Sequence, residues 1–258
     1  MPRSGVDIAA IEVLLCDADG CLFPSEEPAF VASAAVTNEF LEAIGATARF
    51  GAEELRVTTT GKNFRTTAAA LAEAEGIRVP PADLESWVEA ERRQVSAHLS
   101  RALKPDRAVH QPLARLGEER GLALVSSSAT TRLEGCLRAT GLAHLFPPTR
   151  RFSAESSLPV PTSKPDPAIY AFAGERLGIS AAEGLAVEDS VPGAQAAIAA
   201  GFPTVGNVMF VPAPERPERI ADLRRAGVAA IVSSWAELER LLASSPPAEP
   251  AVPGLVGG

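Results

Sequence analysis

Val13-Leu14-Leu15-Cys16-Asp17-Ala18-Asp19-Gly20 is a short apolar run that ends in two carboxylates and a glycine. An apolar run of this length is typical of a strand buried on both faces of a parallel sheet. Asp17 and Asp19 are two residues apart, so in an extended chain their side chains point the same way. Open α/β sheets keep their active sites at the carboxyl ends of their strands, which is where this pair falls. Such close carboxylates repel each other, and a hard dication such as Mg²⁺ would offset them. The alternative is an Asp-Gly turn that ends an ordinary strand.

The composition limits the class of protein. The chain has 258 residues, which allows one large domain or a core domain with a smaller one inserted. Its net charge of −8 gives no general affinity for nucleic acid or for an anionic membrane surface. No apolar run approaches the ~20 residues that span a bilayer. The three cysteines, an odd number without metal-ligand spacing, predict reduced thiols in a cytoplasmic protein.

The second half of the chain alternates between short apolar runs and helical patterns. This alternation predicts right-handed βαβ units and a parallel sheet. The expected strands are 12–18, 122–125, 185–187, 203–208 and 229–232, and the expected helices are 108–120, 131–140, 167–177, 193–200 and 235–242. The segment 145–163 is rich in proline and is expected to be irregular.

Between the first two strands the pattern is helical throughout. Helices are expected at 30–44, 64–75 and 82–103, after a loop that covers 20–28. An all-helical block between two strands predicts a helical domain inserted into an α/β core. The expected division is a core of residues 1–28 and 104–243, a helical cap of 29–103, and a disordered tail of 244–258 that contains several prolines.

Three further motifs follow the Asp17 and Asp19 pair. Ser126 follows a predicted strand, Lys164 stands in Lys-Pro-Asp-Pro, and Glu188-Asp189-Ser190 follows another strand. Alone, each has an ordinary explanation: a polar loop or helix N-cap, a solvated charge, and acids favoured by a helix dipole. Together they bring hydroxyls, a cation and more carboxylates to the same edge of the sheet.

These four motifs, in this order and with a helical insert after the first, resemble the haloacid dehalogenase (HAD) superfamily. The resemblance covers about residues 12–205 and is closest to the branch of β-phosphoglucomutase-like proteins and small phosphatases with a helical C1 cap. It implies an α/β fold with a HAD-like Rossmannoid parallel sheet, helices on both faces, and an inserted α-helical cap. Two positions depart from the family pattern: Cys21 stands where threonine is usual, and Pro24 where many relatives have an acid.

The resemblance also implies roles for the carboxylates. Asp17 would be the nucleophile that forms an aspartyl-phosphate, and Asp19 the general acid and then the base. Mg²⁺ would be held by the Asp17 carboxylate, the backbone carbonyl of Asp19, and Asp189, with Glu188 binding directly or through water.

The remaining implied residues bind the phosphate or the rest of the substrate. Ser126, the backbone N–H of Ser127, and Lys164 would contact the phosphoryl group. In the cap, the stretch 58–65 resembles a glycine-containing substrate loop, in which Gly61, Lys62 and Arg65 would face the leaving group. The alternative is that Lys62 and Arg65 are solvated charges at a helix start.

The leading functional hypothesis is a Mg²⁺-dependent phosphatase that acts on a small phosphorylated metabolite, such as a sugar phosphate. A phosphomutase of the β-phosphoglucomutase type is the alternative, since Asp19 serves both reactions. A non-catalytic protein that binds a phosphate ligand is a more remote alternative. Dehalogenase activity is disfavoured because those relatives lack the second aspartate. The sequence is compatible with a monomer or a homodimer, and predicts neither a nucleic-acid nor a membrane partner.

Overall fold

The structure, a computed structural model, describes residues 7–59 and 63–243. Gly61, Lys62 and the predicted disordered tail lie outside these residues, so the expectations for them stay predictions. Within the described residues, no helix is both long enough and apolar enough to cross a membrane.

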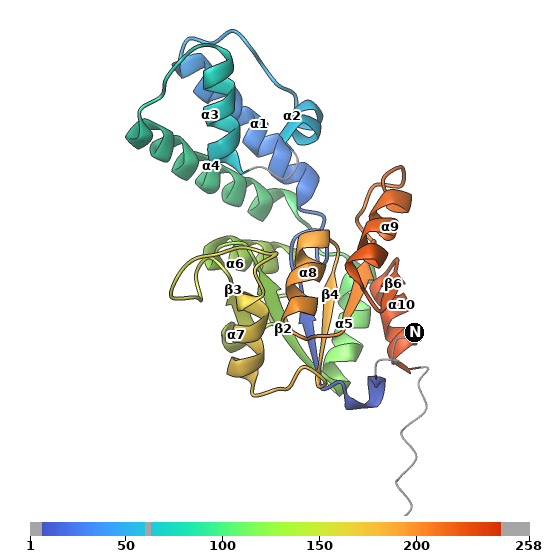
Figure 1. Cartoon of the computed structure of the whole chain (residues 1–258). Helices are drawn as coiled ribbons and strands as arrows, with labels where there is room; N and C mark the ends of the chain where they lie inside the picture. Colours follow the sequence, from blue (N-terminus) through green and yellow to red (C-terminus); the bar gives the residue numbers. More distant parts are fainter. Residues whose placement is uncertain (1–6, 60–62, 244–258) are drawn as a thin grey trace, which may run out of the picture.

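A six-stranded parallel sheet forms the centre of the molecule (Figure 1). Its strands are β1 (Val13–Cys16), β2 (Gly121–Ser126), β3 (Arg151–Ser153), β4 (Gly184–Glu188), β5 (Thr204–Asn207) and β6 (Ala230–Val232). Their order is β3-β2-β1-β4-β5-β6, so the chain winds outward from β1 in one direction and then, from β4, in the other. The carboxyl end of β1 therefore lies where the winding reverses, which is the usual position of a ligand site in such sheets.

Helices cover both faces of the sheet, as a doubly wound fold requires. Leu14 and Cys16 of β1 face a cluster completed by α5 (Arg107–Glu119), α6 (Thr130–Thr140) and α10 (Trp235–Ala243). Val13 and Leu15 point to the opposite face, which α7 (Ala168–Leu177) and α8 (Val191–Ala199) cover. Every residue of β1 is buried, as expected for a strand with side chains packed on two faces. The predicted α/β parallel fold is confirmed.

Between β1 and α5 the described chain forms a helical insert that lies over one end of the sheet (Figure 1). Its helices are α1 (Glu26–Ala43), α2 (Ala52–Thr59), α3 (Phe64–Ala74) and α4 (Pro81–Ala102). They enclose an apolar cluster of their own around Phe40 and Ala68, in which the rings of Phe40 and Trp87 meet edge to face at 5.8 Å. The long helix α4 also packs against α6 and joins this insert to the sheet domain.

Ion pairs connect the helical insert to the rest of the chain on two sides. Arg56 of α2 binds Glu215 at 2.7 Å, just before α9 (Arg216–Ala226). Arg92 of α4 binds Glu155, in the loop after β3, at 2.9 Å. Each pair lines a cavity, Arg56 with Glu215 one and Arg92 with Glu155 another, and each connects the insert to the rest of the chain.

Four elements differ from the sequence-based expectation. Helix α1 begins at Glu26, inside the segment 20–28 that was expected to be a loop. The helix tolerates Pro28 because this residue falls in the first turn, where the backbone N–H has no partner within the helix. Strand β3 lies inside the segment 145–163, which was expected to be irregular, so that expectation is wrong for residues 151–153. The strand is short, and its pairing with β2 rather than an apolar pattern creates it. The polar helices α2 and α9 were missed because few of their residues are buried.

Candidate active site

A tight turn after β1 positions the first two carboxylates. Asp17 continues the strand, with its N–H donating to the carbonyl of Val187 at 3.0 Å. The chain then folds back between Ala18 and Phe23, with Gly20 at φ +78°. A Cβ on Gly20 would overlap the Asp189 carboxylate, so glycine is required both for the left-handed backbone and for this close approach.

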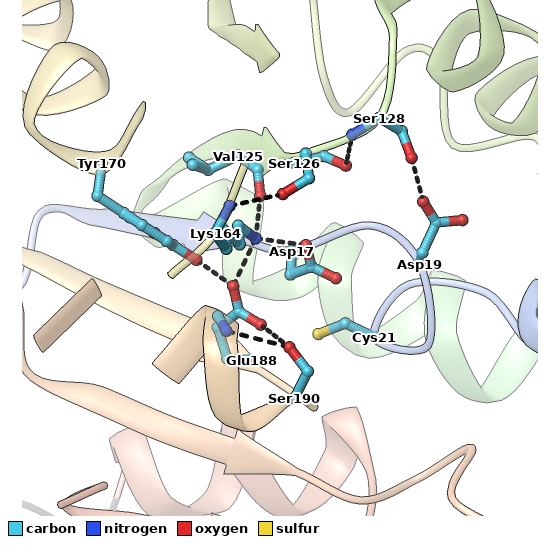
Figure 2. Close-up of polar contacts among 12 residues, drawn as sticks. Asp17, Asp19, Cys21, Val125, Ser126, Ser128, Lys164, Tyr170, Glu188 and Ser190 are labelled. Atoms are coloured by element: carbon cyan, nitrogen blue, oxygen red, sulfur yellow. Dashed lines mark hydrogen bonds and ion pairs between the residues drawn. The ribbon is translucent and has the colours of Figure 1, made fainter. Parts of the chain in front are cut away.

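Lys164 links Asp17 to Glu188 at the centre of the site (Figure 2). Its ammonium donates to Asp17 Oδ1 at 2.5 Å, to Glu188 Oε1 at 2.5 Å and to the carbonyl of Val125 at 2.9 Å. The Lys164 side chain is only 6% exposed. Burial lowers the pKa of Lys164, but the charges of Asp17 and Glu188 outweigh this effect and raise the pKa well above the usual value, which favours the charged ammonium. Burial raises the pKa of Asp17 to about 7, although the ammonium of Lys164 opposes this effect.

Glu188 is fully buried and is held on several sides. Besides Lys164, the hydroxyl of Tyr170 donates to its Oε1 at 2.6 Å and that of Ser190 to its Oε2 at 3.4 Å. A Cβ on Gly193 would overlap this carboxylate, so the glycine in the first turn of α8 lets the helix approach. These contacts occupy Glu188 with internal partners and fix the position of Lys164.

Asp17, Glu188 and Asp189 form a group of carboxylates that fits a metal ion. One oxygen from each lies within 4.8 Å of the others. Burial, followed by the charges of Asp17 and Glu188, raises the pKa of Asp189 well above its usual value. Arg219 of α9 donates to the backbone carbonyl of Asp189 at 2.9 Å and lies 3.7 Å from its carboxylate. Buried oxygens that repel one another are what a hard dication would stabilise.

The Asp19 side chain is turned away from this acidic group toward the loop after β2 (Figure 2). Its carboxylate accepts hydrogen bonds from the hydroxyls of Ser25 at 2.5 Å and Ser128 at 2.7 Å, and from Arg132 at 2.9 Å. Burial alone would raise the pKa of Asp19, but the charge of Arg132 and these hydrogen bonds lower it below the usual value. Ser25 precedes α1 and uses its hydroxyl for Asp19 instead of capping the helix.

The predicted phosphate-binding serines line the turn between β2 and α6. Ser126 is the last residue of β2, is 2% exposed, and accepts a hydrogen bond from the N–H of Ser128 at 3.1 Å. The hydroxyl of Ser127 accepts from the backbone N–H of Lys164 at 3.1 Å, which ties the two predicted motifs together. The site residues that the sequence analysis drew from four separate motifs thus meet at one edge of the sheet.

A cavity of about 370 Å³ separates the helical insert from this edge. Ser127, Ser128 and Arg132 form its sheet side, and Phe64 and Arg65 lie on the insert side. Arg65 lies at the wall of this cavity and pairs with Glu85 on α4. A second cavity, of about 450 Å³, lies on the other side of the turn, next to Gly20 and Asp189.

Sequence reasoning missed Ser25, Ser128, Arg132, Tyr170 and Arg219. Ser128 was visible as part of a serine run, and Tyr170 stands six residues after Lys164, but neither carries a motif of its own. Arg132 and Arg219 lie on helices, where an arginine is most often a solvated charge. The interpretation of the cysteines agrees with the structure: all three are buried free thiols, and burial raises the pKa of Cys136 to about 12.

With this geometry in view, the family can be assigned. The family model of haloacid dehalogenase-like hydrolases matches residues 11–201. The chain belongs to this family. The match spans β1 to the end of α8 and so includes every motif that the sequence analysis used. The predicted membership of the HAD superfamily, and with it the prediction of a hydrolase, is confirmed. A search of curated proteins gives no match.

Solved structures support the same assignment. A HAD family hydrolase from Deinococcus radiodurans R1, with bound phosphate and sodium, is 28% identical with a TM-score of 0.66, over 91% of this chain and 96% of that one. A Thermotoga maritima protein inferred to be a β-phosphoglucomutase is 26% identical with a TM-score of 0.67, over 90% and 99%. A predicted phosphoglycolate phosphatase from Haemophilus somnus, at 20% identity and a TM-score of 0.71 over 90% and 98%, shares the fold.

Mg²⁺ should stabilise this protein against heat. At 100 times its dissociation constant, a ligand of the folded state adds about 2.7 kcal/mol, which corresponds to about 5–10 °C in Tm for a chain of this size. Differential scanning fluorimetry with and without Mg²⁺ measures the shift. Asp189→Asn removes one carboxylate of the group and should abolish most of it, whereas Asp83→Asn, at an exposed acid of α4, should not. An equal shift in both variants would place the ion elsewhere.

Proposed function

We propose that this protein is a Mg²⁺-dependent phosphatase that hydrolyses a small phosphate monoester through an aspartyl-phosphate on Asp17. The observation that carries the proposal is the buried Asp17–Lys164–Glu188 chain beside Asp189, with Asp19 held separately nearby. Asp17 lies beside the ammonium of Lys164 and within the group of carboxylates that fits a metal ion. Asp19 lies instead beside two serine hydroxyls and Arg132. This division supports two different roles for the two aspartates.

In the first step, an oxygen of Asp17 attacks the phosphorus and the leaving oxygen departs with a proton from Asp19. Asp19 has to be protonated when the substrate is bound, and the negative charge of the phosphoryl group favours this by raising its pKa from the lowered value of the free site. In the second, Asp19 removes a proton from water, which attacks the phosphorus and releases phosphate from Asp17. Lys164 offsets the charge of the phosphoryl oxygens and of Asp17. Ser126 and the backbone N–H of Ser127 bind phosphoryl oxygens, as expected for a reaction in which positioning and electrostatics do most of the catalysis.

Asp17 and Asp189 would hold Mg²⁺, together with the backbone carbonyl of Asp19. When bound, the ion would keep the carboxylates ionised and offset the negative charge of the phosphate. Glu188 acts mainly through Lys164 in this proposal, because its oxygens already accept hydrogen bonds from Lys164, Tyr170 and Ser190.

The cavity on the Ser128 side is the proposed site of the leaving group. It adjoins Arg132, which binds Asp19, the residue that must reach the leaving oxygen. Its volume of about 370 Å³ suits a small metabolite, and its polar lining suits a hydroxylated one such as a sugar. Arg65, with Gly61 and Lys62 of the same stretch, would select the distal part of the substrate. The buried reduced thiols support a cytoplasmic location.

A phosphate-release screen tests the proposal. Purified protein with Mg²⁺ is incubated with sugar phosphates, nucleotides and cofactor phosphates, and free phosphate is measured. We expect release from a small subset, lost on addition of EDTA and restored by excess Mg²⁺. If no ester in the panel releases phosphate, the proposed phosphatase function is wrong, and the non-catalytic alternative is then tested by measuring phosphate binding.

The same screen separates hydrolysis from phosphomutase activity. The second activity is considered because the Thermotoga maritima neighbour is inferred to be a β-phosphoglucomutase. A mutase would return an isomerised sugar phosphate and no free phosphate. It would need a sugar bisphosphate to start, because its aspartate has to be phosphorylated before the group can be passed to the substrate. Chromatography of the products, with and without added sugar bisphosphate, distinguishes the two reactions.

A further inference from the structure

Arg132 contacts Asp19, but the proposed mechanism gives Arg132 no role. It lies in the first turns of α6, and its guanidinium donates from Nη2 to Asp19 Oδ1 at 2.9 Å. Of the donors to Asp19 in the described chain, the other two are serine hydroxyls, so Arg132 supplies the positive charge. A charge-assisted hydrogen bond is stronger and more directional than a neutral one.

The remaining donors of Arg132 argue against a purely structural role. Its Nε is buried, yet within the described residues it has no hydrogen-bond acceptor. Buried polar atoms whose role is structural are nearly always paired. Arg132 lines the cavity of about 370 Å³ and also a smaller adjoining one of about 180 Å³ below α1. Arg132 therefore both binds the Asp19 carboxylate and lines the space where the leaving group would lie.

The packing around Arg132 fixes the side chain in this place. Leu133 and Cys136 of the same helix are buried in the core, so α6 cannot turn without disrupting it. On the insert side, Glu91 of α4 lines the same cavities and interacts electrostatically with Arg132. With an acid on each side, the arginine does not bring an unbalanced charge into the site, and its bond to Asp19 holds that carboxylate in a defined orientation.

We propose that Arg132 is a positioning residue: it holds the Asp19 carboxylate in the orientation needed for proton transfer at the leaving-group side of the site. The inference rests on the proposed phosphatase function and adds to it a residue from outside the four motifs. Its effect passes through Asp19, so it should influence catalysis only while Asp19 is present. A residue that stabilised the fold or bound the substrate would act whether or not Asp19 was there.

A double-mutant cycle tests this, with phosphate release from glycerol phosphate, or from another alkyl phosphate that the screen identifies, in the presence of Mg²⁺ as the assay. An alkyl ester is used because its leaving oxygen needs a proton from the general acid. We expect Arg132→Gln to lower kcat by about 10- to 100-fold, the range for loss of a hydrogen bond to a charged group. KM should change by less than about twofold, since ground-state binding is not lost. In an Asp19→Asn background the same substitution should change the residual rate by less than about threefold, because the two effects are not additive.

Two further variants complete the experiment. Arg132→Lys keeps the charge and should recover part of the lost rate, and it also serves if Arg132→Gln folds poorly. Arg138→Gln, at an exposed arginine of the same helix, should leave kcat unchanged. Equal losses in both Asp19 backgrounds, or an unchanged kcat in Arg132→Gln, would overturn the inference while the phosphatase activity of the wild type stood. A wild type without phosphate release would overturn the proposed function and this inference with it.

Discussion

Replacing Asp17 by asparagine should abolish phosphate release and leave the protein folded. The asparagine side chain has nearly the same shape but cannot act as a nucleophile, so the loss should be at least about 10⁴-fold in kcat, as for other covalent catalysts. Folding should survive because the substitution removes one of two buried carboxylates that share Lys164, and the ammonium keeps Glu188 as its partner at 2.5 Å. Phosphate release tests the loss of activity and thermal unfolding tests the retained fold, both measured on the same preparation.

The covalent intermediate supplies a more direct measurement. Wild-type protein quenched during turnover of a ³²P-labelled substrate should carry acid-stable, base-labile label on Asp17, and Asp17→Asn should carry none. Asp83→Asn, at an exposed acid of α4, is the matched control and should label like the wild type. Substantial turnover by Asp17→Asn would show that another group attacks the phosphorus.

The parallel sheet could be predicted from the sequence because its strands are continuous apolar runs. A strand buried on both faces needs nonpolar residues at every position, and the run from Val13 to Cys16 satisfies this without any knowledge of its neighbours. Strand β3 is different, since Arg151 and Ser153 are polar and the strand exists through its pairing with β2. Elements of this kind depend on contacts between distant parts of the chain, which no local pattern records.

The same distinction applies to the site. Asp17, Lys164, Glu188 and Asp189 could be proposed because each stands in a motif. The fold brings the ends of β1 and β4 and the loop before α7, which carries Lys164, to one place. Arg132 and Arg219 act from helix faces, and only the packing of α6 and α9 against the sheet brings them to Asp19 and Asp189. A motif can be recognised from the sequence because its residues are close together in the chain. The side chains that orient those residues come from helices that are distant in the chain and meet the site only in the folded protein.

Replacing Lys164 by methionine should damage both stability and activity. The side chain keeps most of its volume but loses its charge, which leaves Asp17 and Glu188 buried without a counter-charge. Removing one partner from a buried ion pair costs about 3–5 kcal/mol. For a chain of this length that corresponds to about 6–20 °C in Tm. Lys104→Met, at an exposed lysine whose ammonium donates only to the carbonyl of Arg101 in the described structure, should change neither Tm nor phosphate release.

A second substitution separates the two effects of Lys164. In Lys164→Met/Glu188→Gln the unpaired carboxylate at the most deeply buried position is gone, so we expect Tm to recover by at least half of what Lys164→Met lost. Phosphate release should not recover, because the ammonium that offsets the phosphoryl oxygens and Asp17 alongside Mg²⁺ is still missing. If activity returned together with stability, Lys164 would serve the fold alone. If Lys164→Met unfolded at the wild-type temperature, Asp17 and Glu188 would be protonated or solvated once Lys164 is gone, and the ion pairs with Lys164 would not stabilise the fold.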